Sequence, residues 1–97
     1  MNTYILLLKY SEEGILNLKD VPKRMEGIKA AISGVGGTFK DYYLTLGAYD
    51  AVLIAEIPDD ITMAKMALKF GPAGHVSTNS LRAFNWDETV EIVSSLA

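Results

Sequence analysis

Hydrophobic positions along the chain alternate between two periods, and the changes of period divide it into strands and helices. An apolar and aromatic run from Thr3 to Tyr10 predicts a strand. Apolar residues then recur at steps of three and four, which predicts a helix that glycines 34, 36 and 37 end. Its apolar positions are Leu18, Val21, Met25, Ile28, Ile32 and Val35, and its expected solvent side holds Lys23, Arg24, Glu26 and Lys29.

The middle of the chain predicts a hairpin followed by a second helix. Residues 38–46 and 50–57 have β-like composition, and Gly47 supplies the positive φ that a tight turn requires. The run Pro58-Asp59-Asp60 stops the second strand and caps the next helix. The apolar face of that helix is expected to contain Ile61, Ala64, Met66, Ala67, Leu68 and Phe70.

The last quarter of the chain completes the predicted fold. Residues 75–84 predict a fourth strand, and Asp87 is expected to cap a short C-terminal helix. The order β-α-β-β-α-β-α is typical of the ferredoxin-like sandwich, in which helices cover one face of a four-stranded antiparallel sheet. We therefore predict an α+β fold in a single domain over residues 1–97, with strand order 4-1-3-2.

The first and third strands are apolar on both faces. Leu6 and Leu8 point one way while Ile5 and Leu7 point the other, and the strand at 51–57 has the same character. A sheet that is apolar on both faces needs a second cover. The simplest cover is a second copy packed sheet to sheet about a two-fold axis. We therefore expect an obligate homo-oligomer, most simply a homodimer with a barrel-like joint core.

Several segments resemble the GYD-domain family. The family takes its name from the glycine, tyrosine and aspartate that stand here at Gly47, Tyr49 and Asp50. The resemblance implies a dimeric α+β barrel, a superfamily that includes small monooxygenases, isomerases, cyclases and stress-response proteins, and it implies no agreed activity. The segments that carry it are Lys40 to Val52, Pro58-Asp59-Asp60, Leu81-Arg82-Ala83-Phe84, Tyr4 to Tyr10 and Lys19 to Arg24.

Charge and rare residues exclude several classes of function. A net charge of −3 gives no basic stripe for nucleic acid. The absence of cysteine excludes a disulfide, a thiolate metal site and a cysteine nucleophile. With one histidine and no phosphate-binding glycine loop, we expect no metal and no cofactor. The apolar N-terminal run is too short for a membrane span or signal peptide, so a cytoplasmic protein is expected.

Three residues are candidates for catalysis, each with a structural alternative. Asp50 either accepts backbone N–H groups beside the turn or stands with Tyr49 at the mouth of a pocket. His75, at a helix-to-strand junction, is either a base or a surface residue. Tyr43 is the third candidate, because a phenol can orient or protonate an oxygen of a substrate.

Strand periodicity predicts a binding site on the face that the helices leave open. Asp41, Tyr43 and Thr45 share one face of their strand, and Thr78, Ser80, Arg82 and Phe84 share one face of theirs. If both sets lie on the open face, they surround an apolar pocket with polar groups; otherwise they form a solvated rim. The predicted ligand-binding residues are Tyr4, Tyr10, Tyr43, Tyr49 and Arg82.

Two classes of function therefore remain open. The first is a homo-oligomeric binding or interaction module with a pocket for a small apolar or aromatic ligand. The second is a cofactor-independent enzyme that acts on a small aromatic or polyketide-like molecule. No pair of residues forms a convincing acid and base in the sequence, which favours the binding module.

Overall fold

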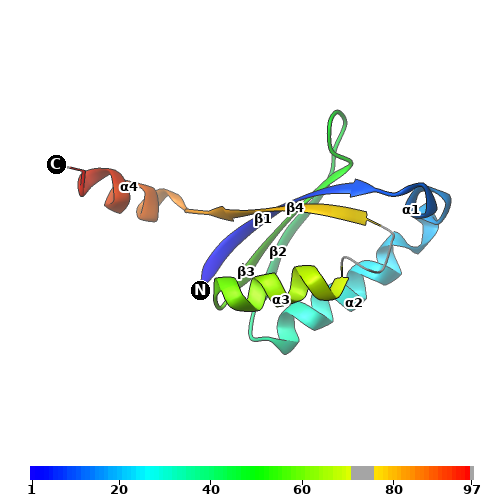
Figure 1. Cartoon of the computed structure of the whole chain (residues 1–97), viewed down its shortest axis with the longest axis horizontal. Helices are drawn as coiled ribbons and strands as arrows, with labels where there is room; N and C mark the ends of the chain where they lie inside the picture. The colour runs from blue at the N-terminus through cyan, green and yellow to red at the C-terminus, as the bar shows by residue number, and fades with distance from the viewer. Residues whose placement is uncertain (71–75, 97) are drawn as a thin grey trace.

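The computed structural model describes residues 1–70 and 76–96, and this part of the chain has the predicted α+β architecture. In Figure 1, α2 and α3 lie beneath one face of the sheet, and α4 extends away from the body at the end of β4. The elements are β1 (Asn2–Tyr10), α1 (Glu12–Leu16), the 3-10 helix η1 (Leu18–Asp20), α2 (Val21–Gly34), β2 (Thr38–Leu44), β3 (Ala51–Ile57), α3 (Asp60–Phe70), β4 (Val76–Ala83) and α4 (Trp86–Ser94).

The four strands form one antiparallel sheet in the order β2-β3-β1-β4. Counted from the β4 edge, this order is 4-1-3-2. In the register, Tyr4 of β1 lies opposite Ala55 of β3 and Arg82 of β4. Directly opposite residues project to the same face of an antiparallel sheet, so the register assigns every strand residue to one of two faces.

One face, which we call the helix-covered face, packs against α2 and α3 and carries the core. Alternate residues of β3 are almost fully buried on it, while their neighbours on the other face are partly exposed. We call that other face the helix-free face. The buried core consists of Tyr4, Leu8, Ile32, Ala51, Leu53, Ala55, Ile57 and Met63.

The helix starts follow local hydrogen bonding. Asp59, as predicted, caps α3, since its Oδ1 accepts the Thr62 N–H at 2.8 Å. The prediction that Asp87 caps the last helix is wrong. Asn85 does so instead, because its extended backbone brings Oδ1 within 2.8 Å of the Glu88 nitrogen, and the Glu88 carboxylate accepts the Asn85 N–H in return.

The hairpin between β2 and β3 is wider than predicted. Gly47 has the expected positive φ, at 112°, but the strands end at Leu44 and resume at Ala51, so residues 45–50 form a longer loop. Residues 12–20 contain α1 and η1, which the pattern did not predict. No helix in residues 1–70 and 76–96 is long and apolar enough to cross a membrane.

Candidate functional site

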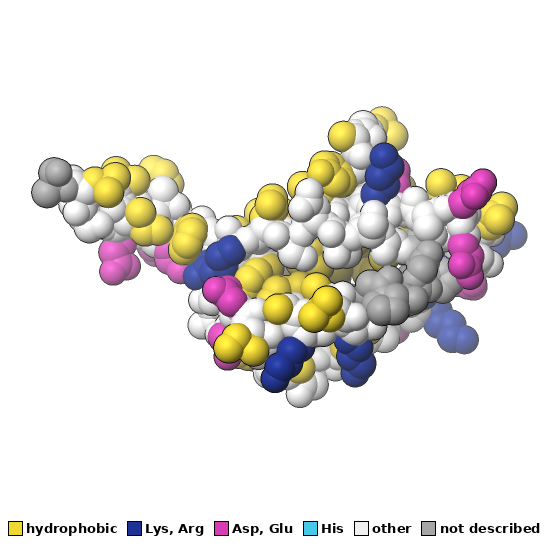
Figure 2. Space-filling model, in the orientation of Figure 1, with side chains coloured by type: hydrophobic (Ala, Val, Ile, Leu, Met, Phe, Trp, Pro, Cys, Tyr) yellow, Lys and Arg dark blue, Asp and Glu magenta, His cyan; other side chains and the backbone are white. Residues whose placement is uncertain are grey.

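A cavity of about 380 Å³ lies between the helix-covered face and helices α2 and α3. Figure 2 shows hydrophobic side chains gathered between β4 and α3, on the side turned to the viewer. Protein interiors rarely contain voids larger than a water molecule. An apolar cavity of roughly 150 Å³ is already large enough to bind benzene, so this space can hold a small molecule.

The wall of the cavity is almost entirely apolar. Three of the chain's four methionines, Met25, Met63 and Met66, contribute to it, and methionine adapts readily to the shape of a ligand. The sheet supplies Leu6, Leu8, Tyr10, Leu53, Ala55, Ile57, Val76 and Thr78. The helices supply Val21, Arg24, Met25, Gly27, Ile28, Ile32, Met63, Met66, Ala67 and Phe70.

Arg24, near the start of α2, brings a positive charge to this apolar wall. Its Nη1 and Nη2 atoms are buried and have no hydrogen-bond partner within residues 1–70 and 76–96. The prediction that Arg24 belongs to the solvent side of its helix is therefore wrong. Arg24 follows Val21 by three positions and precedes Ile28 by four, so its side chain lies on the flank of the apolar face and reaches the cavity.

Two phenols meet on the sheet side of the same cavity. The hydroxyls of Tyr10, which lines the cavity, and Tyr42 are hydrogen-bonded to each other. Burial raises the pKa of Tyr42, the bond to Tyr10 raises it further, and the positive charge of Arg24 acts in the opposite direction. Burial and the bond to Tyr10 together keep the Tyr42 phenol neutral at physiological pH, so it can donate or accept a hydrogen bond.

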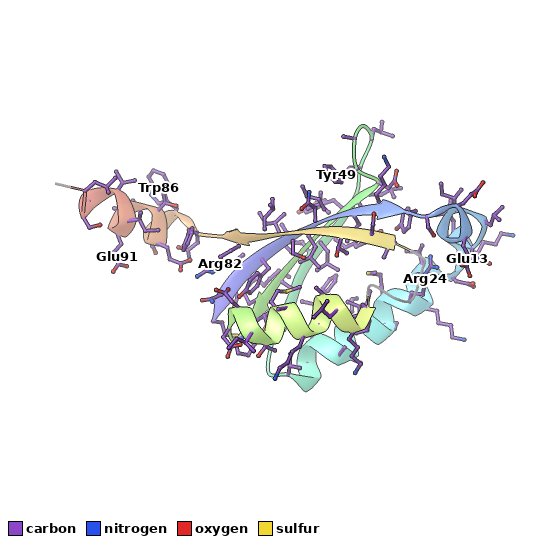
Figure 3. All side chains as sticks on the ribbon, in the orientation of Figure 1. Glu13, Arg24, Tyr49, Arg82, Trp86 and Glu91 are labelled. Carbon is purple, nitrogen blue, oxygen red and sulfur yellow. The ribbon has the colours of Figure 1, made fainter. Side chains whose placement is uncertain are left out.

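Arg82 and Tyr4 lie at the opposite end of the helix-covered face, outside the cavity. The Tyr4 hydroxyl donates to Asp60 Oδ1 of α3, and burial followed by this bond raises its pKa. The Arg82 guanidinium lies 4.0 Å from Asp60 and 3.9 Å from Glu88. Figure 3 shows Arg82 and Arg24 well apart on the helix side of the sheet. This ion-pair group joins α3 to the start of α4.

The prediction that Tyr43 and Arg82 share a cavity on the helix-free face is wrong. Arg82 pairs with the buried Tyr4, which places it on the helix-covered face, whereas Tyr43 pairs with Val52 on the helix-free face. The strand periodicity was read correctly, but the two edge strands present their polar sets to opposite faces. The register between strands decides this, and it cannot be read from one strand alone.

Tyr49 lies on the helix-free face as well. Its hydroxyl accepts a hydrogen bond of 3.2 Å from the Asn79 side chain of β4, so the side chain reaches across the end of the sheet. Figure 3 shows Tyr49 on the side of the sheet away from the helices. Of the five predicted ligand-binding residues, Tyr10 alone lines the cavity.

The catalytic candidates have different positions. The Asp50 carboxylate accepts the Tyr10 N–H at 2.8 Å, so it has the structural role that the turn predicted. Tyr43 is 56% exposed on the helix-free face and does not line the cavity. His75 lies outside the described residues. The structure therefore does not bring Asp50 and Tyr43 to one site.

Comparison with known proteins identifies one family. The GYD domain family matches residues 4–93. No curated protein and no solved structure matches the chain. Within the described part of the chain, no cluster of three or more His, Cys, Asp or Glu side chains is placed to hold a metal ion.

Proposed function

The chain belongs to the GYD-domain family, and we propose that this protein is a homo-oligomeric module that binds a small apolar molecule between its sheet and helices. The observation that carries the proposal is the cavity of about 380 Å³ with its apolar wall. Binding pockets for small molecules are typically about 300–1,000 Å³, mostly apolar, with a few polar groups that orient the ligand. Tyr10, Arg24 and Thr78 are such groups here.

The helix-free face supports the oligomeric part of the proposal. Across its centre, Ile5 pairs with Ile54 and Leu7 with Val52, so four large apolar side chains are adjacent. No described helix packs over them (Figure 1). A contiguous apolar patch of this kind usually marks an interface.

Helix α4 also supports an interface with a second copy of the chain. Its Trp86 and Val93 side chains are 76% and 58% exposed. Figure 2 shows the hydrophobic side of α4 turned the same way as the helix-free face, with the acidic side turned the opposite way. A second copy can cover both surfaces at once, because a two-fold axis places the helix of each copy beside the sheet of the other.

The overall shape agrees with such an exchange. A compact chain of this length has a radius of gyration of about 12.5 Å, whereas this chain measures 14.6 Å, with a longest extent of 51 Å. The projecting α4 accounts for the added length (Figure 1). A helix that leaves its own domain with an exposed apolar side is expected to pack on a neighbour.

One observation favours the second candidate function, a cofactor-independent enzyme. The hydrogen-bonded phenols of Tyr10 and Tyr42 lie beside a cavity that also contains a guanidinium. Such a pair could protonate an oxygen whose negative charge Arg24 stabilises. The enzyme hypothesis requires that a bound compound is recovered chemically changed, and that Tyr10→Phe stops the change while binding persists.

Native mass spectrometry of the purified protein tests the proposal. We expect an even number of subunits, with one small apolar molecule retained per chain. Ala67→Phe fills the cavity from α3 and should abolish retention, while Ala64→Phe, an exposed position on the same helix that does not line the cavity, should preserve it. A monomer without ligand, or equal retention by both variants, would contradict the proposal.

A further inference from the structure

The guanidinium of Arg24 is not explained by binding of a neutral apolar molecule. Burying a charge is costly unless a partner of opposite charge or several hydrogen bonds compensate for it. Nη1 and Nη2 of Arg24 are both buried, and neither has a hydrogen-bond partner in the described chain. Because Arg24 lines the cavity, a ligand in the cavity lies beside this side chain and can supply the missing partner.

The second arginine of the chain shows how this protein satisfies a guanidinium that needs no ligand. Arg82 lies near two carboxylates, Asp60 and Glu88, and donates to the backbone carbonyl of Ala83. It also packs over the Phe84 ring at 4.4 Å. The chain thus surrounds one arginine with anionic and aromatic partners, whereas the other stands at the cavity with no hydrogen-bond partner for its buried Nη1 and Nη2 atoms.

The surroundings of Arg24 do not neutralise it. Tyr10 and Tyr42 use their hydroxyls on each other, and Tyr42 carries no charge at neutral pH, since its pKa is raised. Asp50 is near enough to Tyr42 to raise that pKa, but no carboxylate of residues 1–70 and 76–96 forms an ion pair with Arg24. The described residues that line the cavity include no Asp or Glu.

We infer that the ligand of this cavity is an apolar carboxylate, whose two oxygens accept hydrogen bonds from Nη1 and Nη2 of Arg24 while its hydrocarbon part lies among Met25, Met63 and Met66. This inference rests on the proposed function. The planar guanidinium matches the two oxygens of a carboxylate and stays protonated at any physiological pH. A neutral ligand would leave the charge unpaired, and a small inorganic anion would leave the apolar wall unfilled.

Methionine methyl NMR of the complete protein tests the inference with octanoate and its neutral isostere octanamide. Met25, Met63 and Met66 report on the cavity, while Met1, which is 63% exposed and does not line it, reports non-specific binding. We expect saturable shifts at the three cavity methyls, with octanoate bound at least ten times more tightly than octanamide. Arg24→Gln should reduce octanoate binding to the level of octanamide. Lys23→Gln removes the same charge from an exposed neighbour and should change nothing.

The outcomes separate the inference from the proposed function. Equal affinities for the two compounds at the cavity methyls would overturn the inference and leave the binding module intact. Unchanged octanoate affinity in Arg24→Gln would overturn it as well. No saturable shift at any cavity methyl with either compound would overturn both. If Arg24→Gln fails to fold, Arg24→Lys, which keeps the charge but loses the planar fork, is expected to show a partial loss.

Discussion

The helix-covered face of the sheet has more space than its side chains fill, whereas the helix-free face has apolar side chains that nothing in the described chain covers. The adjacent residues Leu53 and Ile54 illustrate the contrast. Leu53 is 2% exposed and borders the cavity, while Ile54 lies half-buried among Ile5 and Asp41 on the opposite face. Both faces are apolar, so the sequence composition of the strands does not distinguish them.

The difference indicates what each face is for. On the helix-covered face, α2 and α3 contribute Ile32 and Met63 to the core and leave room for a ligand between the helices and the sheet. On the helix-free face, no such element is supplied by residues 1–70 and 76–96, and the apolar side of α4 extends past the sheet instead of folding back on it. The first arrangement fits a small molecule, and the second fits another copy of the chain.

The largest expected effect is on assembly. Ile54→Asp places a charge in the centre of the helix-free face, where a sheet-to-sheet interface would have to bury it. We expect the variant to sediment as the 10.6 kDa monomer, in contrast to an oligomeric wild type. Ser77→Asp, which adds the same charge at the exposed edge of that face, should leave the oligomer intact. Identical masses for wild type and Ile54→Asp would contradict the proposed interface.

The next effect compares neighbouring truncations on the two faces. Leu53→Ala removes core atoms beside the cavity and should lower the free energy of unfolding by about 2–5 kcal/mol. Val52→Ala should cost about 1–2 kcal/mol. If a second copy covers Val52, the loss should shrink as the protein is diluted below the dissociation constant of the oligomer, because association stabilises the fold by mass action. Urea unfolding at two protein concentrations measures both values, and a concentration-independent cost for Val52→Ala would argue against a covered face.

Sequence patterns predicted much of this fold because periodicity reports directly on which residues share a face. The alternation in Tyr4, Leu6 and Leu8 and the helical spacing of Val21, Met25 and Ile28 were both sufficient to place their elements. The binding site was harder to predict, since it depends on how elements are arranged. A strand's alternation does not say which of its faces the helices cover, and that ambiguity misplaced Arg82.

The role of Arg24 was missed for a related reason. A charged residue beside Lys23 and Glu26 is normally assigned to solvent. Its spacing from Val21 and Ile28 did place it on the flank of the apolar face, but a long side chain at such a position can point outward as well as inward. The two observations that reveal its role are the cavity and the unpartnered nitrogens of Arg24, and both depend on how the helices pack on the sheet.

A smaller effect separates the two arginines, Arg24 of α2 and Arg82 of β4. In protein stripped of ligand, Arg24→Leu should raise the free energy of unfolding by about 1–3 kcal/mol, because it removes a buried charge that has no partner. Arg82→Leu should lower it by about 1 kcal/mol, since it leaves Asp60 and Glu88 without their cation. Urea unfolding of both variants gives the two signs. A destabilised Arg24→Leu would mean that Arg24 supports the fold and not a ligand.

The smallest expected effect concerns the start of α3, the helix that closes one side of the cavity. Hydrogen bonds from the side chain and the backbone N–H of Thr62 hold the pKa of the Asp59 carboxyl below its usual value of 3.8. A carboxyl whose pKa falls on folding contributes stability above its unfolded pKa and loses that contribution as the pH drops through the folded pKa.

Asp59→Asn keeps the capping oxygen and removes the charge. We therefore expect its melting temperature to lie slightly below wild type at neutral pH and to converge with wild type below pH 3.8. Glu91→Gln, an equal charge change on the exposed side of α4, should show no such convergence. A constant difference between Asp59→Asn and wild type across the acid range would show that the charge at this cap does not stabilise the helix.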